Sequence, residues 1–296
     1  MALNTWDAKL VLDAKAQLGE GPCWDAERGQ LYWIDIAGES VHCFDPAAGT
    51  NQTIPVGQKV GAVVQRESGG LLVAMHHGLY ELEPETGKLT FLTDPEKHLP
   101  GNRFNDGKCD PAGRFWAGTM HMEETEPTAT LYVLNADRTL ESRVGDITTS
   151  NGLTWSPDGK TMYYIDSPTR TVSAFDYDSS TGTVANRRII IRFDVERGSF
   201  PDGMTADSEG MLWIAEWGGY QVSRWNPQTG EQIGTVRVAS PKVTSCAFGG
   251  DDLQDLYITT ASINNTAEQQ EAYPQAGGIF HVRTGVTGVP TYRYRG

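Results

Sequence analysis

Short runs of apolar, β-branched and aromatic residues recur along the whole chain at similar intervals. Six of these runs resemble one another, and they begin at Leu31, Leu71, Phe115, Met162, Leu212 and Leu256. Their starts lie 40 to 50 residues apart, and most follow a turn that contains Gly, as in residues 156–160 and 207–210. A period of this length fits a repeat of four short strands.

After most of these runs comes a second alternating segment and then a turn, as in residues 79–82 before 84–87. No window of 12 or more residues shows a convincing helical period. Six repeats account for nearly the whole length, which predicts an all-β fold: one six-bladed β-propeller domain over residues 1–296. A solenoid is the alternative, but it lacks evident caps. We expect residues 9–12 to form a strand that joins the last repeat and closes the ring.

Composition supports a folded chain with many turns. Apolar residues make up 39% and aromatic residues 9%, with 33 Gly and 15 Pro, which argues against disorder. The four cysteines are isolated in the sequence, without a C-x-x-C pair, so we interpret them as buried free thiols. The sequence has no signal-peptide pattern and no run approaching 18 apolar residues, which predicts a soluble, cytoplasmic protein.

The formal net charge of -14 narrows the possible partners. Such a surface repels nucleic-acid phosphates and anionic lipids, and it attracts cations toward any acidic concavity. We therefore expect a small-molecule partner, no nucleic acid and no membrane, and a monomer or weak dimer.

Four of the six repeats carry an oxygen-bearing side chain at the same position relative to the strand run. Glu20, Asn105, Asn151 and Asp202 each lie 10 to 12 residues before a strand run, and each is followed by Gly at once or after one residue. Asn-Gly and Asp-Gly pairs taken singly are ordinary hairpin-turn signals. In a propeller, however, residues of equal phase lie at equal height around the axis, so these four side chains would converge on the channel mouth.

This set of side chains predicts a central metal site. Two carboxylates that face each other without a cation are costly, because each raises the pKa of the other. Four oxygen ligands of mixed charge, without Cys or His, favour a hard cation. We expect one divalent metal ion, with Ca²⁺ favoured and Zn²⁺, Mn²⁺ or Mg²⁺ as alternatives. The six histidines show no metal-binding spacing, and we expect none of them to bind the catalytic metal.

Six segments together resemble the gluconolactonase/regucalcin (senescence marker protein) family. These segments are residues 18–22, 102–108, 150–153, 156–160, 201–204 and 243–246. The family consists of six-bladed propellers that are metal-dependent sugar lactonases, and the resemblance covers most of the chain. It implies that Glu20, Asn151 and Asp202 bind the metal and that Asn105 lies beside it as a ligand or a substrate contact.

The resemblance also implies roles in substrate binding and catalysis. Arg103 matches the family's substrate-binding arginine, with a surface salt bridge as the alternative. Asp202 matches the catalytic base. The family's substrate-contacting glutamate follows a Gly-Thr-Met segment and aligns with Glu123, but two residues intervene here and Glu124 is adjacent, so the choice between them stays open. A solvated acidic loop is the alternative for Glu123. We interpret Trp213 and Trp217 as packing residues rather than sugar platforms.

The implied function is that of a hydrolase acting on carboxylic ester bonds (EC 3.1.1), which opens a sugar (aldono-)lactone to the corresponding sugar acid. In this hypothesis the metal polarises the lactone carbonyl and binds the attacking water, and Asp202 removes the proton of that water. Two alternatives remain: a phosphotriesterase or aryl-esterase on the same fold, and a non-catalytic calcium-binding propeller. A protein-interaction propeller of the WD or Kelch type is disfavoured because the chain lacks regularly repeated Gly-His and Trp-Asp pairs.

Overall fold

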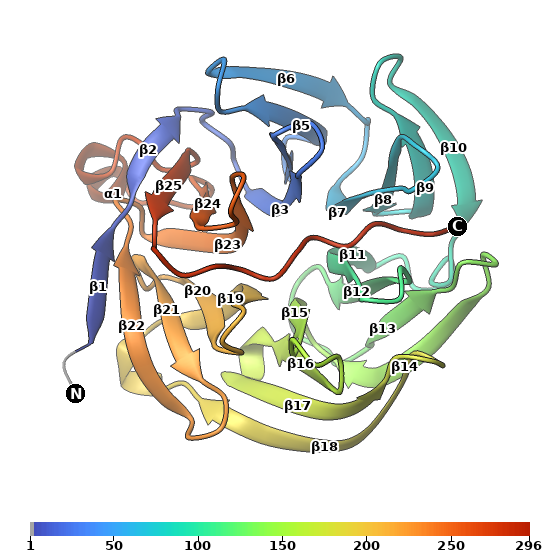
Figure 1. Ribbon diagram of the computed structural model, residues 1–296. Helices are drawn as coiled ribbons and strands as arrows, with labels where there is room; N and C mark the ends of the chain where they lie inside the picture. Colours follow the sequence, from blue (N-terminus) through green and yellow to red (C-terminus); the bar gives the residue numbers. More distant parts are fainter. Residues whose placement is uncertain (1–2) are drawn as a thin grey trace.

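The apolar runs become β-strands, and the strands form small antiparallel sheets arranged around a common axis (Figure 1). The computed structural model describes residues 3–296. The fold is all-β and propeller-like, which confirms the predicted fold class at this level.

Four separate sheets contain four strands each. Their strands are β3 (Gly19–Asp25), β4 (Gln30–Asp35), β5 (Ser40–Asp45) and β6 (Thr50–Pro55); β7 (Val60–Gln65), β8 (Leu71–Met75), β9 (Gly78–Glu83) and β10 (Lys88–Thr93); β11 (Asn102–Cys109), β12 (Phe115–His121), β13 (Ala129–Leu134) and β14 (Leu140–Ile147); and β15 (Ser150–Trp155), β16 (Thr161–Asp166), β17 (Thr171–Asp178) and β18 (Thr183–Arg192). In each sheet the strands follow chain order, so neighbouring strands are joined by short turns.

A nine-stranded sheet contains two further four-stranded groups. The first is β19 (Phe200–Ala206), β20 (Leu212–Trp217), β21 (Gln221–Asn226) and β22 (Glu231–Arg237), extended by the parallel strand β1 (Asn4–Asp7); the second is β23 (Lys242–Gly249), β24 (Asp255–Ala261), β25 (Ile279–Arg283) and β2 (Lys9–Leu12). The two groups pair through Trp217 and Lys242 alone. The antiparallel pairing of β2 with β25 confirms the prediction that residues 9–12 join the last repeat.

All six runs that define the sequence repeat lie in the second strand of a group, namely β4, β8, β12, β16, β20 and β24. The first strands lie nearest the axis, and each contacts the next around a closed ring, in the order β3, β7, β11, β15, β19, β23 and back to β3 (Figure 1). The helical segments are short: α1 (Ala267–Ala272) and the 3-10 helices η1 (Ser167–Thr169) and η2 (Val195–Arg197).

The hydrophobic core lies between neighbouring sheets. Leu131 and Val133 of β13 pack in one cluster with Leu153 and Trp155 of β15, so side chains of adjacent sheets interdigitate. Large aromatic side chains of the second strands, such as Trp33, are fully buried. A fully buried large apolar side chain stabilises the fold by roughly 1.5–3 kcal/mol, and this packing keeps the innermost strands in fixed positions around the axis.

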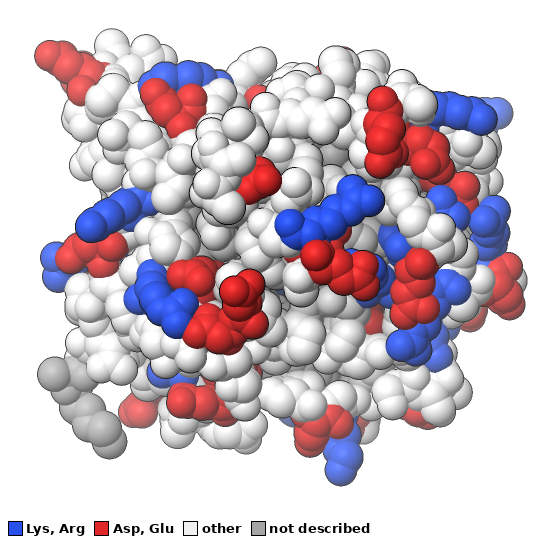
Figure 2. Space-filling view, turned by 45° about the horizontal axis from the view of Figure 1, so that its top comes forward, with Lys and Arg blue, Asp and Glu red and all other residues white. Residues whose placement is uncertain are grey.

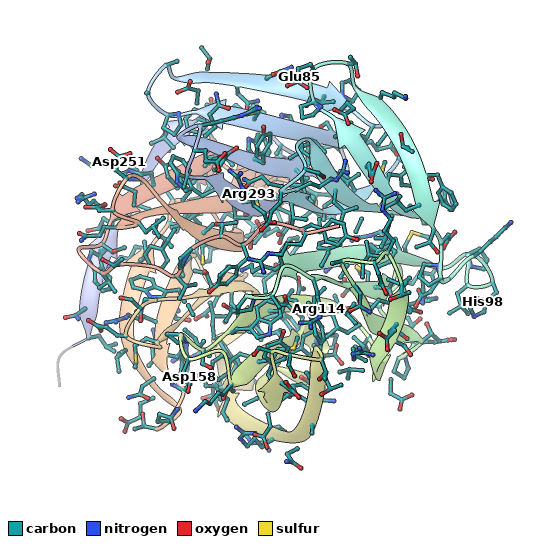
Figure 3. All side chains as sticks on the ribbon, turned by 45° about the vertical axis from the view of Figure 1, so that its right-hand side comes forward. Glu85, His98, Arg114, Asp158, Asp251 and Arg293 are labelled. Carbon is teal, nitrogen blue, oxygen red and sulfur yellow. The ribbon has the colours of Figure 1, made fainter. Side chains whose placement is uncertain are left out.

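The C-terminal segment crosses the middle of the molecule and closes one end of the axis (Figure 1). Residues 289–292 line a cavity of about 40 Å³ together with the distal halves of the innermost strands. The segment is held by Tyr294, whose backbone pairs with Gln65 and Glu67, and by Arg293, which contacts Asp25 at 3.0 Å. Figure 3 shows Arg293 near the centre of the molecule. This end of the axis is therefore covered.

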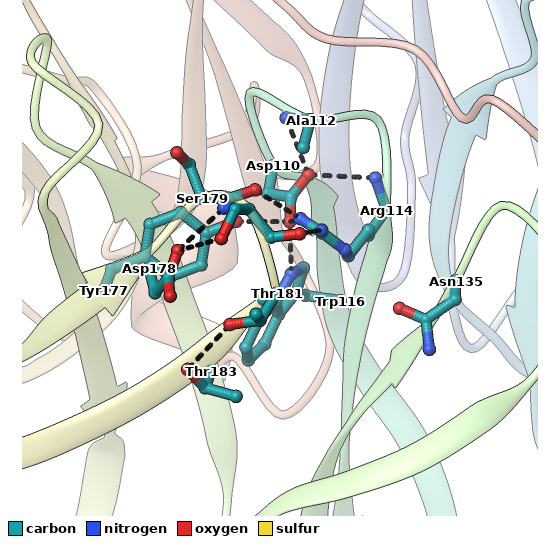
Figure 4. A network of polar contacts seen from close by, with 12 residues as sticks. Asp110, Ala112, Arg114, Trp116, Asn135, Tyr177, Asp178, Ser179, Thr181 and Thr183 are labelled. Carbon is teal, nitrogen blue, oxygen red and sulfur yellow. Dashed lines mark hydrogen bonds and ion pairs between the residues drawn. The ribbon is translucent and has the colours of Figure 1, made fainter.

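A buried carboxylate links two neighbouring sheets (Figure 4). Asp110, which is fully buried, accepts hydrogen bonds from Trp116 Nε1 at 3.0 Å and from the hydroxyl of Tyr177 in the next sheet. Arg114 lies 3.3 Å from the same carboxylate. Asp207 repeats the arrangement, accepting from Trp213 Nε1 at 2.9 Å, six residues later in the sequence as for Asp110.

Asp110→Ala is expected to lower the free energy of unfolding by about 3–5 kcal/mol, because it leaves Arg114 and several buried donors without their acceptor. Urea unfolding measures the change. Asp158→Ala is the matched control, since Asp158 occupies an exposed turn (Figure 3) and should cost about 1 kcal/mol or less. Equal losses for the two variants would contradict the role given to Asp110.

His42 should make stability depend on pH. It is buried, stacks on Trp33 at 3.9 Å between ring centroids, and bonds to Ser40, Asn51 and Thr53. Burial lowers its pKa from 6.5 to about 4, although the charge of Asp35 acts in the opposite direction. Between these values the unfolded chain binds the additional proton, so stabilisation present above pH 6.5 is lost as the pH falls toward 4.

His42→Gln should therefore remove a slope of up to about 1.4 kcal/mol per pH unit from the unfolding free energy in that window. Denaturant titrations across the window measure the slope. His98→Gln, at an exposed position on the outer rim (Figure 3), should leave it unchanged. An unchanged slope for His42→Gln would show that this group does not titrate as argued.

The remaining general expectations concern thiols and charge. All four cysteines are free, as predicted, and three of them are buried. Acidic and basic side chains are interspersed on the face seen in Figure 2. No helix within residues 3–296 is long and apolar enough to cross a membrane.

Candidate metal centre and active site

Each innermost strand shifts register against its neighbour at the same phase of the repeat. The shifts fall between Glu20 and Cys23, Val60 and Ala62, Phe104 and Asp106, Asn151 and Leu153, Pro201 and Met204, and Val243 and Ser245. A β-bulge re-aims one side chain of a strand. The sequence positions singled out by phase are therefore the positions where the backbone departs from regular pairing.

Side chains at four of these six bulges line one cavity of about 180 Å³. Glu20, Asn105, Asn151 and Asp202 all contribute to its wall, and Arg103 lies beside them. Each of the five is buried. The convergence expected from repeat phase is therefore found, while the chemical roles of these residues stay predictions.

Two glycines next to site residues allow the innermost strands to approach closely. A Cβ on Gly152 would lie 2.6 Å from the backbone oxygen of Asp202 in the next innermost strand. A Cβ on Gly203 would collide with the side chain of Ser245, again in the next strand. These contacts explain why Gly follows the site residue in both strands.

A chain of hydrogen bonds connects the site residues around the ring. Arg103 Nη1 donates to Asn105 Oδ1 at 2.8 Å, and Asn105 Nδ2 donates to Asn151 Oδ1 at 3.2 Å. Asn151 Nδ2 donates to Ser167 Oγ at 2.8 Å. Asn105 Nδ2 also donates to the carbonyl of Ser150 at 2.8 Å, which fixes the amide orientation. The network directs the Asn151 oxygen toward Asn105 and engages the Asn105 oxygen with Arg103.

Burial disfavours the charged forms of both carboxylates that are predicted as ligands. Burial, together with the charge of Asp106, raises the pKa of Glu20 to about 8. Burial and the charges of Glu20, Asp106 and Glu124 raise the pKa of Asp202 well above its usual range. Two buried carboxylates whose charged forms are disfavoured by burial and by nearby negative charge form an environment that favours a cation.

The chemistry of these donors fits a hard divalent cation. Glu20 and Asp202 supply carboxylate oxygens and Asn151 an amide oxygen, the ligand types that Ca²⁺, Mg²⁺ and Mn²⁺ prefer. Within residues 3–296 no three His, Cys, Asp or Glu side chains cluster as a potential metal site. The candidate centre is a mixed set of two carboxylates and amides, so it differs from such a cluster.

Arg103 is not a surface salt-bridge residue, because it is buried in the cavity wall. Burial lowers its pKa to about 10, and the charges of Glu124 and Glu20 act in the opposite direction. Both Glu123 and Glu124 are exposed, but only Glu124 contributes to the cavity wall. The backbone of Glu124 has φ 54°, so the chain turns at this residue.

Several wall residues were not predicted from the sequence. Trp217, interpreted there as a packing residue, lines the cavity, while Trp213 is fully buried as expected. Phe200 and Met120 add apolar surface, and Ser167 receives the hydrogen bond from Asn151. The signal for Trp217 is its position directly after a strand run at the site end of β20, but its direction depends on the turn that follows.

The chain is similar in sequence to a putative sugar lactone lactonase and to regucalcins. A sequence model described as the SMP-30/Gluconolactonase/LRE-like region matches residues 18–262. A putative sugar lactone lactonase, YvrE, from Bacillus subtilis is 42% identical over 274 residues, covering 93% of this chain and 94% of that protein. Regucalcin from Gallus gallus is 40% identical over 287 residues, with 95% of each chain covered.

Solved structures give the same relationship. The crystal structure of a calcium-binding protein, regucalcin, from Agrobacterium tumefaciens superimposes with a TM-score of 0.94 and 28% identity, over 100% of both chains. The family resemblance expected from the six sequence segments is thus confirmed. The chain belongs to the SMP-30/gluconolactonase/regucalcin-like family.

Proposed function

We propose that this protein hydrolyses the ring ester of a sugar lactone to the sugar acid, with one divalent cation held by Glu20, Asn151 and Asp202. The observation that carries the proposal is the meeting of two buried carboxylates, both of raised pKa, and an amide oxygen in one cavity beside Arg103. Family membership supports lactone hydrolysis as the reaction class.

We also propose that the nine-stranded sheet counts as two blades, which makes the molecule a six-bladed propeller. The two groups within it pair at one residue pair only, and each has its own innermost strand at the axis. This count gives six equivalent bulges around the axis, four of which carry the predicted site residues.

A bound divalent cation would supply the Lewis acid that polarises the lactone carbonyl and makes water a better proton donor. Asp202 accepts one proton from the attacking water while the oxygen of that water bonds to the carbonyl carbon of the lactone. The ring C–O bond then breaks, and the proton held by Asp202 passes to the departing ring oxygen. The products are a carboxylic acid and a free hydroxyl on one molecule, so atoms and charge balance.

Magnitudes show why Asp202 requires a cation nearby. Free water is a far weaker acid than a carboxylic acid, so the transfer of its proton to Asp202 is mismatched by many pKa units and is strongly unfavourable. Water at a catalytic cation can have a pKa near 7, which reduces the mismatch to a few units. The cation also favours the ionised form of Asp202, which a base requires.

The other polar groups of the cavity fit substrate binding. Arg103 presents a buried guanidinium whose Nη1 already holds the carbonyl of Phe104 at 2.9 Å and Asn105, so the group is fixed in place. Asn105 orients the amide of Asn151. Glu124 offers a carboxylate to the hydroxyls of a sugar, and we propose that it, rather than Glu123, contacts the substrate.

Two rivals use the same architecture. A phosphotriesterase or aryl-esterase would show a different preference among substrates, and a calcium-binding protein without turnover would bind the cation alone. The regucalcin structure from Agrobacterium tumefaciens is described as calcium-binding, which agrees with the cation and leaves turnover to be tested.

The test is a panel of γ- and δ-aldonolactones, aryl esters and organophosphates assayed with each of Ca²⁺, Mg²⁺, Mn²⁺ and Zn²⁺. Acid release is followed for the lactones, with spontaneous opening subtracted. We expect kcat/KM for at least one aldonolactone to exceed that for every ester and phosphotriester by about 10² or more. A preference for the organophosphates, or cation binding without any turnover, would overturn the proposal.

A further inference from the structure

Three second strands carry a buried carboxylate at or next to their last residue, and they are the strands that follow the three predicted metal ligands. Asp35, Asp166 and Glu216 lie 14 or 15 residues after Glu20, Asn151 and Asp202, respectively. They expose 7%, 5% and 1% of their surface. The equivalent strand positions in the other groups are Met75, Thr119 and Thr260. A buried carboxylate therefore occurs at this strand position in the three groups that carry a predicted metal ligand, and not in the other three.

Asp35 and Asp166 hold the same part of the chain relative to their ligands. Asp35 accepts hydrogen bonds from the backbone amides of residues 17 and 18, both at 2.9 Å. Asp166 accepts from the backbone amides of Thr148 at 3.4 Å and Thr149 at 3.0 Å. In both cases the donors lie three and two residues before the ligand. Each carboxylate thus fixes the segment from which the ligand strand begins.

Glu216 makes the equivalent contact with a side chain. Its Oε2 accepts a hydrogen bond from the hydroxyl of Ser199 at 2.7 Å, and Ser199 lies three residues before Asp202. Its Oε1 accepts from Gln221 Nε2 at 2.9 Å. Both carboxylate oxygens of Glu216 therefore accept hydrogen bonds from other side chains of the protein. Glu216 affects the position of Asp202 indirectly, through the chain between Ser199 and Asp202.

The segments held in this way form much of the cavity wall. The residues two positions before the ligands are Leu18, Thr149 and Phe200, and those directly after the carboxylates are Ile36, Ser167 and Trp217. All six line the cavity. A shift at one carboxylate would therefore displace both a ligand and the wall beside it.

In the group that carries Asn105, a carboxylate also holds the residue three positions before the site residue, but this carboxylate lies outside the strands of the group. Glu96, buried in the loop before β11, accepts hydrogen bonds from Asn102 Nδ2 and from Thr119 Oγ1, each at 2.9 Å. Asn102 lies three residues before Asn105, and Thr119 pairs with the residue directly before Asn105, as Asp35 and Asp166 pair with the residues directly before Glu20 and Asn151. All four groups with a predicted site residue therefore contain this contact.

We propose that Asp35, Asp166 and Glu216 are positioning residues of the cation site, each holding one ligand strand in register with the axis. The inference rests on the proposed function, since it assumes that Glu20, Asn151 and Asp202 bind a cation. Groups that orient the ligands of a metal commonly change metal affinity by 10- to 100-fold when they are altered.

The experiment measures Ca²⁺ and Mn²⁺ affinity by calorimetry for the intact chain and for Asp35→Asn, Asp166→Asn and Glu216→Gln, together with the unfolding temperature in chelator. We expect the Kd of each variant to rise by about 10- to 100-fold. Ser199→Ala, which removes only the hydroxyl that Glu216 binds, should raise Kd in the same direction and tests the contact if Glu216→Gln does not fold.

Asp207→Asn is the matched control, because Asp207 is equally buried but binds Trp213 and a turn at the other end of the same sheet. It should lower the unfolding temperature in chelator and leave Kd within about twofold. Unchanged Kd in the three variants, with only stability lowered, would overturn the inference. Absence of cation binding by the unaltered chain would instead overturn the proposed function, and the inference with it.

Discussion

Asp202→Asn is expected to lower kcat for lactone hydrolysis by about 10³-fold while the fold is retained. General-base catalysis contributes roughly 10²- to 10⁴-fold, and an amide cannot accept the proton of the attacking water. The substituted side chain keeps one oxygen that can bind a cation, so the variant separates the two roles proposed for Asp202. Turnover is therefore measured at rising cation concentration until the rate no longer increases.

The control is Asp176→Asn, at an exposed carboxylate that pairs with Arg188 at 2.7 Å and lies in β17 of a neighbouring sheet. It should retain the full rate. Recovery of the Asp202→Asn rate to within a few-fold of the unaltered protein at saturating cation would assign Asp202 as a ligand only. In that case another group must remove the proton.

Removal of the cation is expected to have the largest effect, lowering the rate by about 10³-fold or more. Without it, burial raises the pKa of both Glu20 and Asp202, the charge of Glu20 raises that of Asp202 further, and water stays a very weak acid. Dialysis against chelator followed by addition of single cations measures both the loss and its recovery. The protein should also unfold at a lower temperature in chelator, because a ligand at 100 times its Kd stabilises the folded state by about 2.7 kcal/mol.

A matched variant distinguishes the proposed site from cations bound elsewhere. Glu20→Gln should lose most of the chelator-dependent change in unfolding temperature, whereas Glu209→Gln, at an exposed acidic residue of a turn, should keep it. Turnover that persists in chelator after spontaneous lactone opening has been subtracted would exclude the mechanism.

Much of the architecture could be predicted from the sequence because it depends on local patterns repeated many times. The runs beginning at Leu31 and Met162 both became second strands, and the N-terminal segment 9–12 closed the last group as expected. The repeat phase also brought Glu20 and Asp202 to one cavity. In a ring of similar sheets, residues at the same position of each sequence repeat lie at the same height along the axis.

Features that depend on irregular turns could not be predicted in this way. The choice between Glu123 and Glu124 depends on one turn in which Glu124 has a positive φ. Trp217 reaches the cavity because of where β20 ends, which the apolar pattern does not specify. The acidic ends of the runs at Asp35 and Asp166 were visible in the sequence, but their function depends on hydrogen bonds to amides 17 residues earlier or more.

The central claim is that the ring of innermost strands brings Glu20, Asn151 and Asp202 to a single cation. The most direct measurement is a crystal structure of the protein grown with Mn²⁺, with an anomalous difference map calculated for manganese. We predict one strong peak in the cavity, with oxygens of all three residues within about 2.0–2.6 Å of it. A cavity without a peak in metal-replete crystals, or a cation bound only at other residues, would contradict the account.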